Sequence, residues 1–233
     1  MNNLIIPDGK VTGCLPRTTR FGECCSPMSD RIHVIEDDDA IKALIGKISL
    51  RPFIEHVFDQ DGVGSCAAEG STQPVQLMMA WNGRTVPKLS PWSVYCFTCD
   101  GRDQGSSIDD NLVHIRDVGV LTMETWPRSK GWNRKPPESL LADEAAKYRI
   151  DEFFDIGSIA EVRTALVLGY PVTYGWKGHC CLLVELKDLD TAFYLNSWGE
   201  DWGDHGVGEI KLREIDFRYG AFAVRSVVDA GGA

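Results

Sequence analysis

Apolar residues recur at helical spacing in three stretches before residue 170. The first is EDDDAIKALIGKI at 36–48, and the second is SSIDDNLVHIRDVG at 106–119. The third, GSIAEVRTALVLGYP at 157–171, begins with a capping box formed by Ser158 and Glu161. The apolar faces are Ile41, Leu44, Ile45 and Ile48; Ile108, Leu112 and Ile115; and Ile159, Val162 and Leu166. This periodicity predicts one amphipathic helix in each stretch.

Beyond Gly169 the pattern changes to short β-rich segments, separated by turns rich in Gly, Asp and Lys. The segments are PVTYGW, HCCLLVELK, TAFYLNS, GVGEIKL and AFAVRSVV. Because they follow one another closely, they predict an antiparallel meander or barrel. Helices followed by strands indicate a segregated α+β fold, and we expect two lobes with a cleft between them. Residues 127–138 are expected to form an exposed connection.

Composition and charge restrict the class of protein. Hydrophobic residues make up 43% of the 233 residues and aromatic residues 9%, which is typical of a globular chain rather than a disordered or membrane protein. The formal net charge of -10 has no compensating Lys/Arg stripe, so no nucleic-acid partner is expected. The start, MNNLIIPDGKVTG, lacks the features of a signal peptide. A cytoplasmic protein without a membrane partner is therefore predicted.

The eight cysteines are expected to be free thiols rather than a disulfide framework. A structural zinc site is the alternative interpretation, because Cys96 and Cys99 form a C-x-x-C pair. A second spaced pair is missing, since the cysteines at 24–25 and at 180–181 are adjacent. No metal and no cofactor are therefore expected.

Cys66 is the first candidate for chemistry. It follows a turn at Gly64 and Ser65 and begins the stretch CAAEGSTQPVQLMMAW, which can form a helix. The free N–H groups and the dipole of a helix N-terminus favour a thiolate, the nucleophilic form of cysteine. Gly70 and Pro74 predict a break or kink in that helix. The alternative for Cys66 is a buried core thiol beside two alanines.

A cysteine nucleophile needs a base, and His179 is the best placed of the five histidines. It opens the apolar segment CCLLVEL, so its backbone is fixed while its side chain lies at a strand end. His33, His56 and His114 lie in helical or linker settings, and His205 lies in the charged turn GDHGVG. The alternative for His179 is a purely structural role.

The stretch YLNSWGEDWGDHGVGEIKL at 194–212 resembles the papain-like cysteine peptidases. In that family an Asn-Ser-Trp-Gly run, a second Trp-Gly and a Gly-x-Gly strand follow the catalytic histidine. The stretch DQDGVGSCAAEG at 59–70 is similar to the family's nucleophile segment, with Gln60 six positions before Cys66. The order Gln, Cys, His, Asn requires four separate positions to agree.

Two further stretches look like bacterial and phage members of this family. They are LRPF at 50–53 and DGRDQGSSIDDNLVHIRDVGV at 100–120. The resemblance covers roughly residues 49–228. It implies a papain-like fold in which a helical lobe and an antiparallel β-barrel-like lobe flank the active-site cleft.

The resemblance also implies a role for each matching residue. Cys66 would be the nucleophile, and His179 would be its general base and later the acid for the leaving amine. Asn196 would orient the imidazole through a side-chain hydrogen bond. Gln60 would donate its side-chain N–H to the oxyanion, beside the backbone N–H of Cys66.

Three more residues have implied supporting roles. Trp198 would shield the His–Asn hydrogen bond from water, with a simple core aromatic as the alternative. Gly105 and Ser106 fall where the family's backbone pairs with an extended peptide, although the family usually has a second glycine at the position of Ser106.

The sequence departs from the family pattern at several positions. Ala67 stands where the signature has an aromatic residue, Asp61 where glycine usually follows the glutamine, and Val63 where many secreted members have a disulfide cysteine. The missing cysteine agrees with a reducing compartment. His179 follows Cys66 by 113 positions, fewer than the family's usual separation. Substrate preference is therefore not carried over.

The predicted domain organisation has three parts. Residues 49–228 form the catalytic domain, with a helical lobe at about 55–126 and a β lobe at about 127–228. Residues 229–233 form a flexible tail. Residues 1–48 are too few for the usual secreted propeptide; bracing the lobes from outside is the favoured role, and covering the cleft is the alternative.

We therefore predict a cysteine-dependent peptidase that hydrolyses peptide or isopeptide bonds of a peptide or protein substrate through an acyl-enzyme on Cys66. Two alternatives stay open. One is a non-catalytic papain-fold module of a phage virion or a bacterial assembly, because fold alone does not prove activity. The other is a cell-wall peptide amidase or an acyltransferase with the same Cys-His-Asn mechanism.

Overall fold

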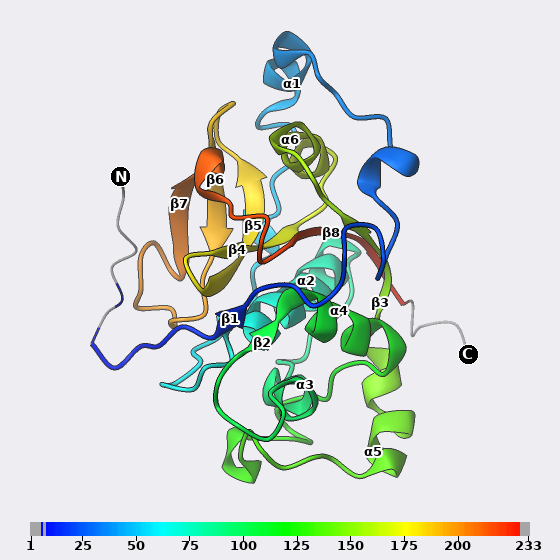
Figure 1. The fold of residues 1–233 in the computed structure, drawn as a ribbon, viewed down its shortest axis with the longest axis vertical. Coiled ribbons are helices and arrows are strands. Elements are labelled where there is room, and N and C mark those ends of the chain that lie inside the picture. Colours follow the sequence, from blue (N-terminus) through cyan, green and yellow to red (C-terminus); the bar gives the residue numbers. More distant parts are fainter. Residues whose placement is uncertain (1–5, 7, 229–233) are drawn as a thin grey trace.

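Two lobes lie on either side of the N-terminal part of the chain in the computed structural model, which describes residues 6 and 8–228 (Figure 1). The tail predicted at 229–233 lies outside these residues. One lobe contains helices α2 (Cys66–Trp81), α3 (Trp92–Thr98), α4 (Ile108–Asp117) and α5 (Glu138–Asp143). The other contains a six-stranded sheet with helices α1 (Asp38–Leu44) and α6 (Ile159–Val167). The predicted α+β class is confirmed.

The sheet is antiparallel throughout, in the order β3-β8-β4-β5-β6-β7. Its strands are β3 (Ile150–Asp155), β4 (Val172–Trp176), β5 (His179–Leu186), β6 (Thr191–Leu195), β7 (Val207–Lys211) and β8 (Ala221–Val227). Five of them coincide with the five β-rich segments of the sequence. The three helices predicted from periodicity are also present, as α1, α4 and α6.

Helix α6 begins as its capping box predicts. The Ser158 hydroxyl accepts a hydrogen bond from the Glu161 N–H at 3.2 Å, and the Glu161 carboxylate accepts one from the Gly157 N–H at 2.7 Å. Gly169, just after the helix, has a φ of +81°, the left-handed conformation that glycine adopts without strain. Helices α6 and α1 pack against each other beside the sheet.

Strand β3 is the element that the pattern does not predict. Its sequence, IDEFFD, places two aromatic residues next to each other, so apolar and polar positions do not alternate. The pairing of β3 with β8 shifts register on both sides of Glu152. Such an irregularity moves the following side chains to the opposite face, which explains why the strand has no period of two.

Helix α2 spans the whole stretch that the sequence can form as a helix, and neither Gly70 nor Pro74 breaks it. Proline cannot donate to the carbonyl four residues earlier, which belongs to Gly70. That carbonyl instead accepts a hydrogen bond from Thr173 Oγ1 on β4, at 3.2 Å. Gly70 itself is required by close packing, because a Cβ there would lie 2.6 Å from Cys180 Sγ. The sheet lobe thus supplies the hydrogen-bond donor that Pro74 cannot provide.

Residues 10–20, which we call the strap, cross between the two lobes (Figure 1). Strand β1 (Cys14–Leu15) of the strap pairs in parallel with β2 (Ser106–Ser107), directly before α4. Leu15 is 42% exposed, whereas Cys14 is buried. The strap is therefore hydrogen-bonded into the body of the protein rather than laid loosely on its surface.

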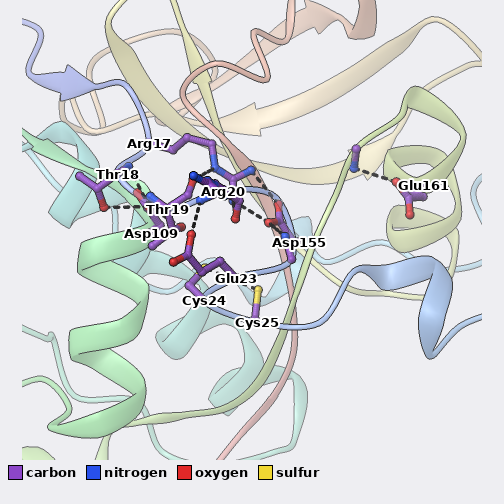
Figure 2. Close-up of polar contacts among 12 residues, drawn as sticks. Arg17, Thr18, Thr19, Arg20, Glu23, Cys24, Cys25, Asp109, Asp155 and Glu161 are labelled. Atoms are coloured by element: carbon purple, nitrogen blue, oxygen red, sulfur yellow. Dashed lines mark hydrogen bonds and ion pairs between the residues drawn. The ribbon is translucent and has the colours of Figure 1, made fainter.

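Two buried carboxylates hold the far end of the strap (Figure 2). Arg17 donates to both oxygens of Asp155, at 3.1 and 2.6 Å. Asp109 Oδ2, at the start of α4, accepts from the backbone and hydroxyl groups of Thr18 and Thr19 at 2.7 to 3.0 Å. Asp155 ends β3, so the strap is attached to both lobes.

In the described part of the chain, no helix has the length and apolar character needed to span a membrane.

Candidate active site

Cys66 is the first residue of α2, as the sequence predicts, and it is fully buried. Asp103 fixes the turn that precedes it. Asp103 Oδ1 accepts hydrogen bonds from the Gly64 N–H and from the Tyr95 hydroxyl, each at 2.8 Å. The backbone around the sulfur is therefore held by side chains from the helical lobe.

His179 begins β5, and its Nε2 lies 2.7 Å from Asn196 Oδ1. The same oxygen accepts the Ser197 backbone N–H at 2.8 Å. A backbone N–H can only donate, so Asn196 Oδ1 is an acceptor and His179 Nε2 carries the proton of the neutral ring. His179 Nδ1 is then the basic nitrogen, and it has no hydrogen-bond partner within the described residues.

Trp198 covers this pair. Its ring stacks on the His179 ring with centroids 4.6 Å apart and an angle of 22° between the planes. Trp198 is 3% exposed, and the Trp202 ring contacts it in a T-shaped arrangement with centroids 5.6 Å apart. The indole therefore lies where it can exclude water from the hydrogen bond between His179 and Asn196.

Gln60 is buried and held at both ends of its amide. Its Oε1 accepts from the Ser197 hydroxyl at 2.8 Å. The other end of the amide faces two carbonyl oxygens, which can only accept, so that end is the NH₂ group. Its Nε2 donates to the Val63 carbonyl at 2.8 Å and to the Val11 carbonyl at 3.0 Å. Because Val11 belongs to the strap, the Gln60 N–H group is directed into the cleft.

The strap lies directly over these groups. The Gly13 N–H points at Cys66 Sγ, with 3.1 Å between nitrogen and sulfur. The Gly13 carbonyl accepts the Ser106 N–H at 2.9 Å, two residues beyond the carbonyl bound by Gln60. One short segment thus contacts the nucleophile candidate, the oxyanion-donor candidate and the predicted peptide-pairing backbone.

Close backbone approach explains the glycines on both sides of the cleft. A Cβ on Gly13 would overlap the Gly64 carbonyl oxygen, and one on Gly105 would overlap the Gly13 carbonyl oxygen. Gly105 also has a φ of +94°, which a side chain would strain. On the opposite wall, the Cys14 N–H donates to the Gly178 carbonyl at 2.8 Å. Backbone contacts from both lobes therefore hold the strap at Gly13 and Cys14.

Burial keeps the candidate nucleophile and base neutral in this conformation. Cys66 and His179 both have no exposed surface. Burial raises the pKa of the Cys66 thiol and lowers the pKa of His179 to about 4, because both charged forms lose their hydration. Neither a thiolate nor an imidazolium is favoured while the strap excludes water.

Glu69 is a buried carboxyl one turn after Cys66 that sequence reasoning missed. Its Oε1 accepts from the Ser65 hydroxyl and from Arg128, each at 3.1 Å. Ser65 occupies the N-cap position of α2, but its hydroxyl does not cap the helix. Burial raises the pKa of Glu69 to about 7, although the Arg128 guanidinium opposes this shift.

This carboxyl predicts a pH dependence of stability. The folded protein holds the Glu69 proton more tightly than the unfolded chain, so the free energy of unfolding should decrease by about 3 kcal/mol between about pH 4.5 and about pH 7, and level off above. Urea unfolding across this pH range measures it. Glu69→Gln should remove the decrease, whereas Glu138→Gln, at an exposed position, should retain it. A slope that Glu69→Gln leaves unchanged would contradict the assignment.

One group among the described residues brings possible metal ligands together: Cys24, Cys25 and Asp155, with ligand atoms within 4.8 Å of one another. Both Asp155 oxygens already accept hydrogen bonds from Arg17, which neutralises the carboxylate. Cys96 and Cys99, the basis of the alternative zinc interpretation, do not belong to this group. All eight cysteines lie in the described part of the chain as free thiols.

The departures from the family pattern have local explanations at two positions. Asp61 has a φ of +53°, a left-handed conformation in which glycine is unstrained and aspartate is tolerated better than most residues. Val63, at the position where many secreted members have a disulfide cysteine, packs beside Tyr95 and Cys99. Nothing in the structure explains Ala67 beyond its complete burial.

The structure links the seven sequence-predicted residues through the strap or through His179. Gln60, Cys66, Gly105 and Ser106 contact the strap. Asn196 and Trp198 contact His179, which follows the residue whose carbonyl binds Cys14 of the strap. Sequence reasoning missed Asp103 and Glu69, and it gave covering of the cleft by residues 1–48 only as an alternative, without locating the strap. Asp103 follows a Gly-Arg pair in a polar loop, so its sequence carries no signal that distinguishes it from a solvated residue. The Val-Thr-Gly run of the strap carries no such signal either.

No family model and no curated protein sequence matches the chain. Solved structures do match. Xylellain, a cysteine protease from Xylella fastidiosa, has a TM-score of 0.71 at 18% identity, covering 97% of this chain and 100% of xylellain. A digestive procathepsin L 3 from Tenebrio molitor larval midgut has a TM-score of 0.61 at 15% identity, over 76% and 69% of the two chains. A cysteine protease from Carica candamarcensis has a TM-score of 0.59 at 19% identity, over 76% and 97%. The chain therefore has the papain-like cysteine protease fold.

Proposed function

We propose that this protein is a thiol peptidase that hydrolyses amide bonds of extended peptides at Cys66. The observation that carries the proposal is a length of peptide backbone already bound across the cleft, with the Val11 carbonyl on Gln60 and the Gly13 N–H on Cys66. A groove that bonds to the main chain accepts extended peptides with little dependence on their side chains. The papain-like fold supports the same chemistry.

The reaction begins with proton transfer within the cleft. His179 Nδ1, which has no other partner in the described chain, takes the thiol proton of Cys66. The resulting thiolate and imidazolium stabilise each other once water or substrate replaces the strap. Asn196 holds the imidazole by accepting from Nε2, and Trp198 keeps competing water from that hydrogen bond.

The thiolate then attacks the substrate carbonyl carbon. Its oxygen gains negative charge and accepts hydrogen bonds from Gln60 Nε2 and from the Cys66 N–H. The tetrahedral intermediate collapses, the carbon–nitrogen bond breaks, and the imidazolium gives its proton to the leaving amine. Water, deprotonated by His179, attacks the resulting thioester and regenerates the Cys66 thiol. Losing one oxyanion donor typically costs about 3 kcal/mol of transition-state stabilisation.

The substrate class follows from the shape of the cleft. Beside Gly105, the Ser106 N–H donates to the Gly13 carbonyl of the strap, and a substrate peptide would use the same backbone edge. A hollow of about 670 Å³ continues beside Gly105. Peptide and isopeptide bonds, including those of cell-wall peptides, are substrates of the same chemistry, and cleavage of a mixed library distinguishes them.

In the conformation described, the enzyme is latent. The strap fills the positions that a substrate needs, and it turns an amide hydrogen rather than a carbonyl carbon toward Cys66 Sγ. Of the two roles considered for the N-terminal extension, this contact favours covering the cleft for residues 10–15.

Thiol alkylation tests the proposal. In a chain opened by Gly13→Ala, iodoacetamide near pH 6 is expected to label Cys66 well ahead of the other seven cysteines, because an adjacent imidazolium maintains the thiolate. Peptide mapping identifies the labelled residue. Cleavage of a mixed peptide library by the same chain, with added Cys66→Ala as control, identifies the substrate bonds.

The outcomes separate the candidate functions. Equal labelling of several cysteines would contradict the assignment of Cys66 as the nucleophile. The binding-module alternative, in which the cleft only holds a peptide, would then remain. Selective labelling of Cys66 without cleavage of any peptide in the library would retain the reactive site but contradict peptide hydrolysis.

A further inference from the structure

Cys24 and Cys25, which we call the cysteine pair, are the two cysteines that solvent can reach. Both are partly exposed, whereas the other six cysteines are buried. The pair follows the strap in sequence and lies beside Asp155 (Figure 2). The proposed mechanism uses only Cys66, so it gives these two thiols no role. Because a reagent in solution meets them first, they are the thiols most open to modification in the closed chain.

The two sulfurs of the pair face each other. Cys24 Sγ and Cys25 Sγ are 3.9 Å apart, within the range of a hydrogen bond between thiols. This contact is the largest cause of a Cys24 pKa lowered to about 7 and of a raised pKa for Cys25, because the Cys25 thiol donates to the Cys24 thiolate. A thiol whose pKa is near the ambient pH attacks disulfides efficiently. The geometry thus joins a nucleophilic sulfur to a second sulfur that can resolve the product.

Asp155, the third possible ligand beside the pair, is already engaged. Its two oxygens accept from Arg17 at 3.1 and 2.6 Å, and Oδ2 also accepts the Gly22 N–H at 2.8 Å. The two thiols that remain are fewer than the ligands of a structural zinc site. Oxidation to a disulfide needs no third group, so it is the chemistry that this arrangement supports.

The cysteine pair is connected to the strap through Asp155. The Gly22 N–H, before the pair, donates to Asp155 Oδ2, and the Ser26 carbonyl, after the pair, accepts the Asp155 N–H at 3.0 Å. The Asp155 carboxylate in turn holds Arg17 of the strap. A change in the backbone of the pair would therefore act on the residue that anchors the strap to the sheet lobe.

Closing a disulfide between neighbouring residues requires such a change. The sulfurs must approach from 3.9 Å to about 2.05 Å. Adjacent Cα atoms are about 3.8 Å apart, which is less than the roughly 4.4–6.8 Å that disulfides usually span. The backbone torsions of both residues must therefore turn. The Cys24 carbonyl carbon belongs to the ring that forms, so its oxygen, which accepts from Arg116 Nη1 at 2.8 Å, would move relative to that donor.

We propose that Cys24 and Cys25 form a reversible disulfide whose closure loosens the attachment of the strap through Asp155. The pair is thus a redox-controlled modification site, and its effect on catalysis rests on the peptidase activity proposed above. In the reduced form the segment keeps its hydrogen bonds to Asp155, and Arg17 holds the strap closed. In the oxidised form the strap opens more often. A strained disulfide is easily reduced, so a thiol restores the closed form.

The oxidant is a low-molecular-weight disulfide. The Cys24 thiolate attacks one of its sulfurs, which breaks the sulfur–sulfur bond, forms a mixed disulfide on Cys24 and releases one small thiol. The Cys25 sulfur, on losing its proton, attacks the Cys24 sulfur and releases the second small thiol. The two protein thiols give up two protons and two electrons, and the small disulfide takes them up to become two thiols.

The first experiment incubates the full chain in mixtures of reduced and oxidised glutathione, followed by alkylation, trypsin digestion and mass spectrometry. Trypsin releases residues 21–31, which contain the cysteine pair and no other cysteine. At oxidising ratios this peptide is expected to be unalkylated and lighter by two hydrogen atoms, and a reductant should restore alkylation. Cys25→Ser should give a glutathione adduct on Cys24 instead. Cys96→Ser, which removes a buried thiol of α3, should retain the disulfide.

Amide hydrogen exchange of the strap measures the effect on its attachment. Oxidation should make the amides of residues 10–20 exchange about tenfold faster, as expected when hydrogen bonds to a charged group weaken. A chain carrying both Cys24→Ser and Cys25→Ser, in the same oxidising buffer, should exchange at the rate of the reduced chain.

A glutathione adduct on Cys24 of the unaltered chain, in place of the internal link, would overturn the disulfide. A linked pair without faster exchange would overturn its control of the strap. Neither measurement requires turnover. A chain that shows both effects and cleaves no peptide would therefore support this inference and count against the peptidase alone.

Discussion

Replacing Gly13 by alanine is expected to raise kcat/KM toward a peptide substrate about 10- to 100-fold. The added methyl group would overlap the Gly64 carbonyl oxygen, a backbone atom that cannot turn aside as a side chain could. Overpacking of this kind costs about 1–3 kcal/mol, and about 1.4 kcal/mol corresponds to a tenfold change in an equilibrium. The strain is confined to the closed strap, so the equilibrium shifts toward the open form. Initial rates at low substrate concentration measure the effect.

Gly9→Ala is the matched control for this variant. It adds the same methyl group to the same N-terminal segment, but nothing lies within 4 Å of that position. Its φ of +78° means that alanine strains the local turn by about 1 kcal/mol without entering the cleft. Activity should therefore stay near that of the unaltered chain. If Gly13→Ala and Gly9→Ala give equal rates, the strap does not restrict access to Cys66.

His179→Ala, made in the chain opened by Gly13→Ala, is expected to lower kcat/KM on the order of 10³-fold. In the proposed mechanism the imidazole is both the base that accepts the Cys66 proton and the acid that protonates the leaving amine, so its removal eliminates both. The reactivity of Cys66 toward iodoacetamide near pH 6 should fall in parallel, because no cation remains to favour the thiolate. Kinetics and alkylation rates are measured on the same preparations.

His33→Ala is the control for histidine loss, since His33 is exposed and lies outside the cleft. Its activity should match that of the opened chain. Near-UV circular dichroism of each variant verifies that the buried aromatic residues remain packed. A folded His179→Ala chain that keeps more than a tenth of the activity would exclude His179 as the base.

Local pattern predicted most elements because their stabilising contacts are encoded within each segment. Helix α6 illustrates this, since Ser158 and Glu161 form its cap and both lie within three residues of its start. Helix α2 continues through Pro74, where its own sequence favours a break or kink. The hydrogen bond that compensates for Pro74 comes from Thr173, about a hundred positions away. Strand β3 was missed because its register shift at Glu152 disturbs the alternation on which the prediction depends.

In the candidate site, too, some residues were predicted from the sequence, whereas the contacts made by distant segments were not. Gln60, Cys66, His179 and Asn196 were predicted through a resemblance that depends on residue types in a fixed order. The sequence offered covering of the cleft by residues 1–48 only as an alternative and could not locate the strap, because its contacts join Gly13 to residues more than fifty positions away, and β1 is two residues long. The charge of Glu69 likewise depends on Arg128, which begins a short 3-10 helix (Arg128–Lys130) whose position sequence alone does not give.

The hydrogen bond from Thr173 to Gly70 also bears on how the cleft opens. Separating the lobes at this point would leave the Gly70 carbonyl unpaired inside the protein, because Pro74 offers no donor to replace Thr173. A second bond, from Gln73 Nε2 on the same helix to the Asn196 carbonyl at 3.0 Å, would break as well. Helix α2 is thus coupled mechanically to the sheet that carries His179. We expect the distance between the sulfur and the imidazole to stay nearly constant during activation, with the motion confined to the residues above them.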